Sequence, residues 1–446
     1  MLPLALDIWI TGGMVWDATV AAPWLADLHI RDGVIVEVGA LQPPDGAHIV
    51  DATGATILPG LVDSHVHISM DPGAAFRTTT PEQHSDALDA HLRAYLACGV
   101  TTILDPAIAP DELTLVRSRL AAGVPAPNFY TLGTPLSPTD GYVSAVIPGF
   151  PSVSTVADVG PALDRVVAQG AVGVKTTVEP GFAAPIWEVY SPEVREAICV
   201  GAAARGLTVY THAMSAKHQA LAIDALDAQV LVHPLARPNA AFVAKAAAAG
   251  VFEISTLAIL DSFRTGWEPE RLDDPLIQRV VPTEEIETAR THTDEFQRQF
   301  IQTNFPRFPI RGFVRWFVFR ESTMAARLGR EMAALRDLAA AGVGIVMGSD
   351  SGNWPVILSE FHGPTSIREM ELLALAGFSP AEALTAATLT PARMLKLDAT
   401  QGTVEAGKRA DLVIVEGDPL QDLGALRHVR YTVRAGGVKT PEGWLR

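Results

Sequence analysis

Between residues 58 and 399, short apolar runs rich in β-branched residues alternate with alanine-rich stretches of helical character. Alternation of this kind is typical of parallel strands whose crossover helices cover the sheet. We therefore predict an α/β fold, a (β/α)8 TIM barrel, in which the chemistry lies at the carboxyl ends of the strands. The predicted strands are residues 60–67, 101–104, 128–132, 173–177, 208–212, 230–233, 252–256 and 344–348.

The two ends of the chain show a different pattern, that of a small β-sheet. Residues 1–57 contain short alternating segments separated by Gly-Gly and Asp-Gly pairs, and similar segments return in residues 400–446. Such patterns indicate strands joined by tight turns. We predict that both chain termini form one small β-sandwich domain, with the barrel of residues 58–399 inserted between them.

The connection between the seventh and eighth predicted strands is too long for a plain loop. Residues 261–335 contain a polar helical segment, followed by a run in which arginines alternate with aromatic residues. Long insertions are often lids or binding loops, so we expect a lid-like insertion. In that case an inward-facing arginine such as Arg315 would bind a substrate carboxylate. The alternative is an amphipathic helix pair that only covers the barrel.

Composition limits the partners of this chain. Its 446 residues carry a formal net charge of -16, whereas nucleic acids and anionic membranes attract basic surfaces. No apolar stretch is long enough to span a bilayer, and the first residues lack the basic segment of a signal peptide. Cys98 and Cys199 suggest neither a disulfide framework nor a thiolate metal site. We expect a cytoplasmic protein with a small-molecule substrate and no nucleic acid or membrane partner.

Side chains able to bind a metal lie at or near the carboxyl ends of five of the predicted strands. In an extended strand, His65 and His67 would project to the same face. Imidazole and carboxylate groups suit divalent ions of the zinc type. A hydrogen-bonded polar patch is the alternative for the histidine pair, and a helix N-cap is the alternative for Asp350. The candidate set is His65, His67, Lys175, His212, His233 and Asp350.

Lys175 lies inside an apolar predicted strand, where an unpaired ammonium is costly. Reaction of its amine with carbon dioxide would give a carbamate, an anionic ligand that can bridge two metals. A salt-bridged lysine at the barrel rim is the simpler alternative. Two loop residues are candidates for substrate contact: Tyr142 as a hydrogen-bond donor to a carbonyl or oxyanion, or else a packing residue, and His362 after the eighth strand.

A series of motifs appears in a fixed order along nearly the whole chain. They are PGLVDSHVH at 59–67, GVTTILD at 99–105, GVKTT at 173–177, THA at 211–213, VHP at 232–234, GSD at 348–350 and GTVEAGKRADLVIVEGDPL at 402–420. The sequence thereby resembles the amidohydrolase superfamily, particularly its imidazolonepropionase-like and prolidase-like (Xaa-Pro dipeptidase type) branch. It departs from that branch at Leu104, where an arginine is usual, and at residues 136–142, which replace a Gly-Gly-His element.

The resemblance implies a binuclear metal centre. His65, His67 and Asp350 would bind one divalent ion, His212 and His233 the other, and a carboxylated Lys175 would bridge them. The ions would be Zn²⁺, or else Mn²⁺ or Co²⁺. The family mechanism implies a metal-bridging hydroxide as nucleophile, with Asp350 transferring its proton to the leaving group.

The expected reaction is hydrolysis of an amide bond in an N-acyl amino acid, a dipeptide, or an aryl or cyclic amide, by a homo-oligomer. Hydrolysis of a lactone, carbamate or phosphotriester and deamination of a ring are the alternatives at the same site. A metal-free, non-catalytic scaffold is the alternative from a different class.

Overall fold

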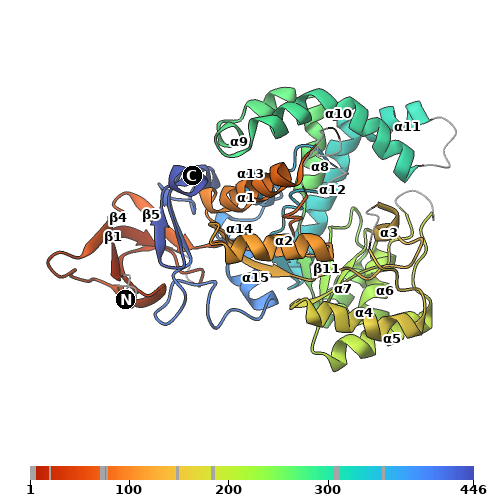
Figure 1. The fold of residues 1–446 in the computed structure, drawn as a ribbon, viewed down its shortest axis with the longest axis horizontal. Coiled ribbons are helices and arrows are strands. Elements are labelled where there is room, and N and C mark those ends of the chain that lie inside the picture. The colour runs from red at the N-terminus through yellow and green to blue at the C-terminus, as the bar shows by residue number, and fades with distance from the viewer. Residues whose placement is uncertain are drawn as a thin grey trace.

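The computed structural model gives the fold of most of the chain. It describes residues 7–19, 22–70, 76, 79–146, 150–181, 186–305, 311–353 and 357–446. The predicted strand-and-helix alternation is present, with mixed α and β content throughout (Figure 1). None of the helices in these residues is long and apolar enough to cross a membrane.

Two parallel sheets carry the central part of the chain. The three-stranded sheet contains β6 (Leu61–Asp63), β7 (Val100–Asp105) and β8 (Asn128–Thr131). The five-stranded sheet contains β9 (Gly173–Thr177), β10 (Thr208–His212), β11 (Val230–Val232), β12 (Phe252–Ile254) and β13 (Gly344–Val346). The ladders do not join into one closed sheet, so closure into a (β/α)8 barrel stays a prediction.

Backbone hydrogen bonds connect the two sheets at both seams. The Val172 N–H donates to the Thr131 carbonyl at 3.0 Å, and the Ser64 N–H donates to the Met347 carbonyl at 3.0 Å. Strands of both sheets also share one buried apolar cluster, which includes Val62, Leu104, Val232, Ile254 and Val346. The carboxyl ends of the strands therefore meet around a common interior.

Helices separate these strands in sequence and pack on their outer side. They are α1 (Pro81–Ala97), α2 (Pro110–Ala121), α3 (Tyr142–Val146), α4 (Val156–Ala168), α5 (Pro192–Ala204), α6 (Ala216–Leu226), α7 (Ala240–Ala249), α13 (Pro364–Leu375), α14 (Pro380–Ala386) and α15 (Leu389–Met394). Several begin at a side-chain cap, because Thr80, Ser191 and Asn239 each accept a backbone N–H of the first turn. These caps fix where each helix leaves its preceding loop.

The two chain ends pair in a single sheet, at the left of Figure 1. Its strands are β1 (Asp7–Val15), β2 (Trp24–Arg31), β3 (Val34–Gly39), β4 (His48–Asp51) and β5 (Ala55–Pro59), then β14 (Leu412–Glu416), β15 (Val429–Arg434) and β16 (Gly437–Lys439). Antiparallel pairing of β5 with β14 joins the two ends. Division of this sheet into the two layers of a sandwich, and the predicted domain boundaries, stay predictions. The chain closes with η4 (Leu423–Arg427) and α16 (Pro441–Leu445).

The long connection between β12 and β13 is helical. It contains α8 (Ala258–Ser262), η2 (Phe263–Gly266), η3 (Pro269–Asp273), α9 (Pro275–Val280), α10 (Thr283–Asn304), α11 (Arg311–Val318) and α12 (Glu321–Ala340). Figure 1 shows α9, α10 and α11 along one edge of the molecule, with α8 and α12 on their inner side. A buried contact between His91 of α1 and Glu285 of α10, 2.9 Å from Nε2 to Oε1, anchors this insertion. Its role as a lid stays a prediction.

The first strand of the central sheets is shorter than the predicted 60–67, because β6 ends at Asp63. The buried Asp63 carboxylate accepts hydrogen bonds from the backbone of His65 at 3.3 Å and of Ser349 at 3.0 Å. These bonds hold the chain in a loop. His65 and His67 therefore lie beyond the strand, and strand alternation, the reason given for their shared orientation, was the wrong reason.

Candidate metal centre

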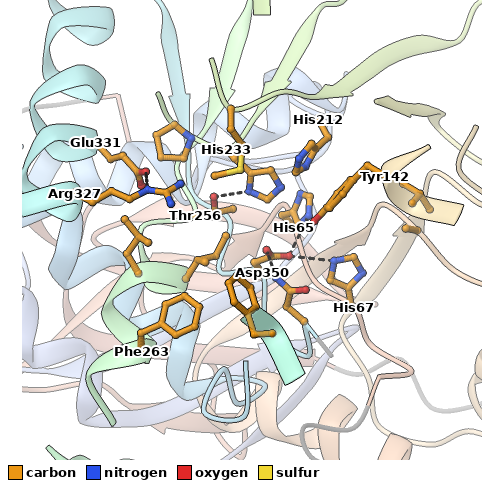
Figure 2. Close-up of a pocket in the computed structure, with 18 of the residues that line it drawn as sticks. His65, His67, Tyr142, His212, His233, Thr256, Phe263, Arg327, Glu331 and Asp350 are labelled. Carbon is orange, nitrogen blue, oxygen red and sulfur yellow. Dashed lines mark hydrogen bonds and ion pairs between the residues drawn. The ribbon is translucent and has the colours of Figure 1, made fainter. Parts of the chain in front are cut away.

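All the predicted metal ligands line one cavity at the carboxyl ends of the parallel strands. They come from β9, from the end of β10 and from the loops after β6, β11 and β13, and all are buried. Figure 2 shows the four histidines and the aspartate converging. The lining members of the predicted set are His65, His67, Lys175, His212, His233 and Asp350.

His65, His67 and Asp350 offer ligand atoms that all lie within 4.8 Å of one another. Asp350 Oδ1 is 3.2 Å from His65 Nε2 and 3.1 Å from His67 Nε2. The other carboxylate oxygen, Oδ2, accepts a hydrogen bond from Asn353 Nδ2 at 2.7 Å, which fixes the carboxylate plane. Two imidazole nitrogens and a carboxylate oxygen thus face one point, as a divalent transition metal requires.

His212 and His233 form a second imidazole pair, with ring centroids 4.6 Å apart. His233 Nδ1 lies 2.9 Å from Thr256 Oγ1, a contact that orients the ring and leaves Nε2 for a ligand (Figure 2). His212 Nε2 is buried and has no hydrogen-bond partner in the described part of the chain. A buried, unpaired ring nitrogen is costly unless something binds it, so this pair also fits a metal.

Gln219 of α6 holds the two segments that carry this second pair. Its Nε2 donates to the carbonyl of Ala213 at 3.1 Å and to the carbonyl of His233 at 2.9 Å. Gln219 is completely buried. The separation between the two imidazoles therefore depends on a side chain that the sequence did not single out.

Lys175 lies on β9 and is buried, and no ion pair of its ammonium occurs among the described residues. This position does not match the alternative of a salt-bridged lysine at the rim. Burial lowers the pKa of Lys175 to about 7, although the Asp350 charge opposes that change. Near pH 7, a substantial fraction of the amine is then uncharged. The uncharged amine is the form that reacts with carbon dioxide.

Burial also keeps most of the imidazoles neutral. It lowers the pKa of His65 to about 4, with the Lys175 charge as a second cause, and it brings the pKa of His212 and His233 well below the ordinary value. His67 differs, because its contact with Asp350 outweighs burial and raises its pKa. Neutral imidazole is the form that binds metal ions.

Three residues of the cavity have backbone conformations that are rare for residues other than glycine. The φ angles are 75° at His233, 28° at Thr256 and 59° at Asp350. Hydrogen bonds hold this geometry, for example from the Asp350 N–H to the His65 carbonyl at 2.8 Å. Backbone strain of this kind gathers at functional sites, where the surrounding structure maintains it.

The three predicted substrate contacts have different positions. Tyr142 lines the cavity and stacks on His212, with ring centroids 4.4 Å apart (Figure 2). Burial raises its pKa, so its hydroxyl is a neutral donor. His362 does not line the cavity: Nδ1 is 2.9 Å from the Tyr95 hydroxyl and Nε2 is 3.0 Å from the Met70 carbonyl. Both ring nitrogens of His362 have partners in this geometry, and substrate contact by His362 stays a prediction.

Arg315, the arginine predicted to bind a substrate carboxylate, is not among the described residues that line the cavity, and its contact with substrate stays a prediction. It lies on α11, away from the cavity, and its Nη1 pairs with Asp294 Oδ1 at 2.7 Å near the surface. The insertion does supply an arginine to the cavity, but it is Arg327 of α12, whose Nε donates to Glu331 Oε1 at 3.0 Å. The sequence signal was an Arg and Glu four residues apart, which is indistinguishable from an ordinary surface pair on a helix.

The fold and the site together define a class: an α/β protein with a histidine-rich ligand set at the carboxyl ends of parallel strands. The model of the amidohydrolase family matches residues 56–441, and the chain belongs to that family. The resemblance noted in the sequence is thereby confirmed at the level of the amidohydrolase family.

Individual relatives are more distant. A dihydroorotase of Citrifermentans bemidjiense is 38% identical over 73 residues, which are 16% of this chain and 17% of the relative. The chain thus matches less than a fifth of that relative's length. Among solved structures, a Xaa-Pro dipeptidase with bound methionine has a TM-score of 0.75 at 20% identity, covering 97% of this chain and 100% of that one. A prolidase complexed with N-methylphosphonate-L-proline has a TM-score of 0.73 at 21% identity, covering 97% and 99%. At these identities the two structures show a shared fold.

Proposed function

We propose that this protein is a binuclear metal-dependent amidohydrolase that cleaves an amide bond. The observation that carries the proposal is the convergence of His65 Nε2, His67 Nε2 and Asp350 Oδ1, next to a second imidazole pair in the same cavity. Family membership, and relatives named dihydroorotase and allantoinase, support a reaction at a carbon–nitrogen bond. A closed (β/α)8 barrel and a terminal β-sandwich are part of the proposal.

The proposed ligands divide into two groups. His65, His67 and Asp350 would hold one ion, and His212 and His233 would hold the other. A carbamate on Lys175 would supply the shared anionic ligand, which the buried and unpaired amine favours. Divalent ions bound there, Zn²⁺ or else Mn²⁺ or Co²⁺, would lower the pKa of water to about 7 and polarise the scissile carbonyl.

The protein's own groups would move the proton and orient the substrate. Asp350 would accept the proton of the attacking water and deliver it to the leaving nitrogen, because an amine leaves only after protonation. Asn353 holds the carboxylate in place for both steps. Tyr142 would donate a hydrogen bond to the oxygen that gains charge in the transition state.

Other reactions would use the same ligand set. A lactone, carbamate or phosphotriester also needs an activated water beside a polarised centre, so these substrates are the alternative. Lys175 favours two metals and therefore disfavours a single-metal ring deaminase. A metal-free scaffold is disfavoured because every predicted ligand faces the cavity. We also propose a small-molecule substrate, a homo-oligomer and a cytoplasmic location, each from the sequence.

A substrate panel tests the proposal. The purified full chain and Asp350→Asn are assayed with N-acyl amino acids, dipeptides, anilides, cyclic amides, lactones, carbamates and phosphotriesters. We expect at least one amide to release its amine with the wild-type chain and not with Asp350→Asn. Turnover of only lactones or phosphotriesters would reject amide cleavage, and no turnover of any class with metals added would support the scaffold.

A further inference from the structure

One wall of the cavity is apolar and comes from the helical connection between β12 and β13, most of which is the insertion. Ile259 and Leu260 of α8, Phe263 of η2, Phe300 of α10 and Met324 of α12 all line it. In Figure 2, Phe263 lies on the side away from Tyr142, with Asp350 between them. The candidate metal ligands thus occupy one end of the cavity, and the insertion closes the other.

The aromatic rings of this wall are packed against one another. Phe263 and Phe300 meet edge to face with centroids 5.8 Å apart, and Phe319 lies behind both, at 5.1 Å from Phe263 and 5.5 Å from Phe300. Phe263 and Phe319 are each 7% exposed. Edge-to-face contacts of this kind fix the rings, so the apolar wall is formed before a substrate arrives.

The positive and negative side chains on this side of the cavity are paired with each other. Among the described lining residues, Arg327 and Glu331 are the only charged side chains besides the candidate metal ligands. Arg327 Nε donates to Glu331 Oε1 at 3.0 Å, and the Glu331 carboxylate is buried. The pair leaves no net charge there, so contact with this wall removes apolar surface from water without separating charges.

We propose that this wall, to which Phe305 also contributes as a lining residue, is a subsite for a large apolar group, of phenyl size or larger, on the substrate. The inference rests on the proposed function and narrows it. Hydrophobic amides would be substrates, whereas small polar cyclic amides would leave the wall in contact with water. The insertion is then the element that sets specificity.

Equilibrium binding tests the subsite independently of turnover. Two pairs of amides are compared by calorimetry on Asp350→Asn: an N-acetyl against an N-phenylacetyl amide of one amine, and a methylamide against an anilide of one acid. We expect the phenyl member of at least one pair to bind roughly tenfold or more tightly, since even one methylene in an apolar pocket gives about that discrimination. Equal affinities within both pairs would overturn the subsite.

Variants locate the effect on the wall. Phe300→Ala should reduce the ratio of the two affinities, phenyl member over small member, by roughly tenfold. The affinity for the small member should stay unchanged. Phe313→Ala is the matched control, because Phe313 lies on α11 of the same insertion, outside the cavity, and is 59% exposed. If thermal melts show that Phe300→Ala does not fold, Phe305→Ala replaces it. Equal effects of wall and control variants would overturn the assignment.

The kinetic outcome separates the two proposals. If the amides are hydrolysed with equal kcat/KM within both pairs, the amidohydrolase proposal stands and the subsite is wrong. If no amide is hydrolysed but the phenyl preference in binding follows Phe300, the subsite stands and the reaction is wrong.

Discussion

Asp350 contacts His65 through both its backbone and its side chain. The Asp350 N–H donates to the His65 carbonyl at 2.8 Å, and Asp350 Oδ1 lies 3.2 Å from His65 Nε2. The two residues belong to loops after β6 and β13, strands of different sheets. The geometry of the candidate metal site is therefore set at the seam where the two sheets meet.

The carboxylate of Asp350 should be essential for turnover. In Asp350→Asn the amide cannot accept the proton of the attacking water and is a weaker ligand, so we expect kcat to fall by roughly 10²–10⁴-fold or more. Steady-state kinetics on the amide found in the panel give the measurement. Asp224→Asn is the control, because Asp224 is exposed and pairs with Lys245 on the surface. Unchanged kcat in Asp350→Asn would exclude the proposed proton transfer.

Lys175 should be needed for the second metal. Lys175→Ala removes the amine that forms the carbamate, so we expect loss of activity and of one metal ion, with partial recovery on adding a short-chain carboxylate. Metal analysis and activity with and without propionate give the readouts. Lys217→Ala, an exposed lysine on α6, should change neither. Full turnover by Lys175→Ala would show that the bridging role is wrong.

Gln219 should act as a positioning residue for His212 and His233. Gln219→Leu keeps the volume but removes the hydrogen bonds to the Ala213 and His233 carbonyls, as well as one to Glu253 Oε1. Losses of this kind cost about 10–100-fold in metal affinity. Titration of the metal-depleted protein should show weakening of one metal equivalent. Gln278→Leu is a control at an exposed position, because Gln278 also donates to a backbone carbonyl, that of Leu272, outside the cavity. A loss of stability without a change in metal affinity would assign Gln219 a structural role only.

Asp261 should stabilise the insertion in a pH-dependent way. It is buried, and Arg368 of α13 donates to it at 2.8 Å and 3.1 Å. Burial alone would raise the pKa of Asp261, but Arg368, Arg271 and Arg264 outweigh burial and lower it. Because the folded-state pKa is lowered, the stabilisation is present above the unfolded-state value near 4 and is lost as the pH falls through the folded-state value.

We therefore expect Asp261→Asn to reduce the free energy of unfolding by about 3 kcal/mol at pH 7, as breaking a buried pair does, and by less at pH 3, which lies below the unfolded-state pKa. Urea unfolding at both pH values gives the measurement. Asp164→Asn, whose partner Arg205 lies with it at the surface, should cost under about 0.5 kcal/mol at either pH. A loss for Asp261→Asn that is the same at both pH values would contradict the charge argument.

The sequence identified the strands and the residues at their ends because both depend on local patterns. Apolar runs of β-branched residues marked the eight strands, and polar residues at their ends marked the cavity. The limits of the first strand could not be read in this way, because β6 stops where Asp63 bonds to the distant Ser349. That contact is tertiary and leaves no periodic signal.

In the insertion, too, the sequence could not show which side chains reach the cavity. Arg315 and Arg327 both lie on amphipathic helices, and the pattern cannot tell which face meets solvent and which meets the cavity. His362 looked available in a loop after a strand, yet Tyr95 and Met70 occupy its two nitrogens. Residues that act through packing between distant segments, such as Gln219, are found only once the segments are brought together.

The number of metal ions bound per chain tests the central claim most directly. We expect protein purified without chelators to hold two equivalents of a divalent transition metal, and chelation to abolish amide hydrolysis until metal is restored. A chain that binds no such metal, and that gains neither bound metal nor activity when zinc, manganese or cobalt is supplied, would contradict the account.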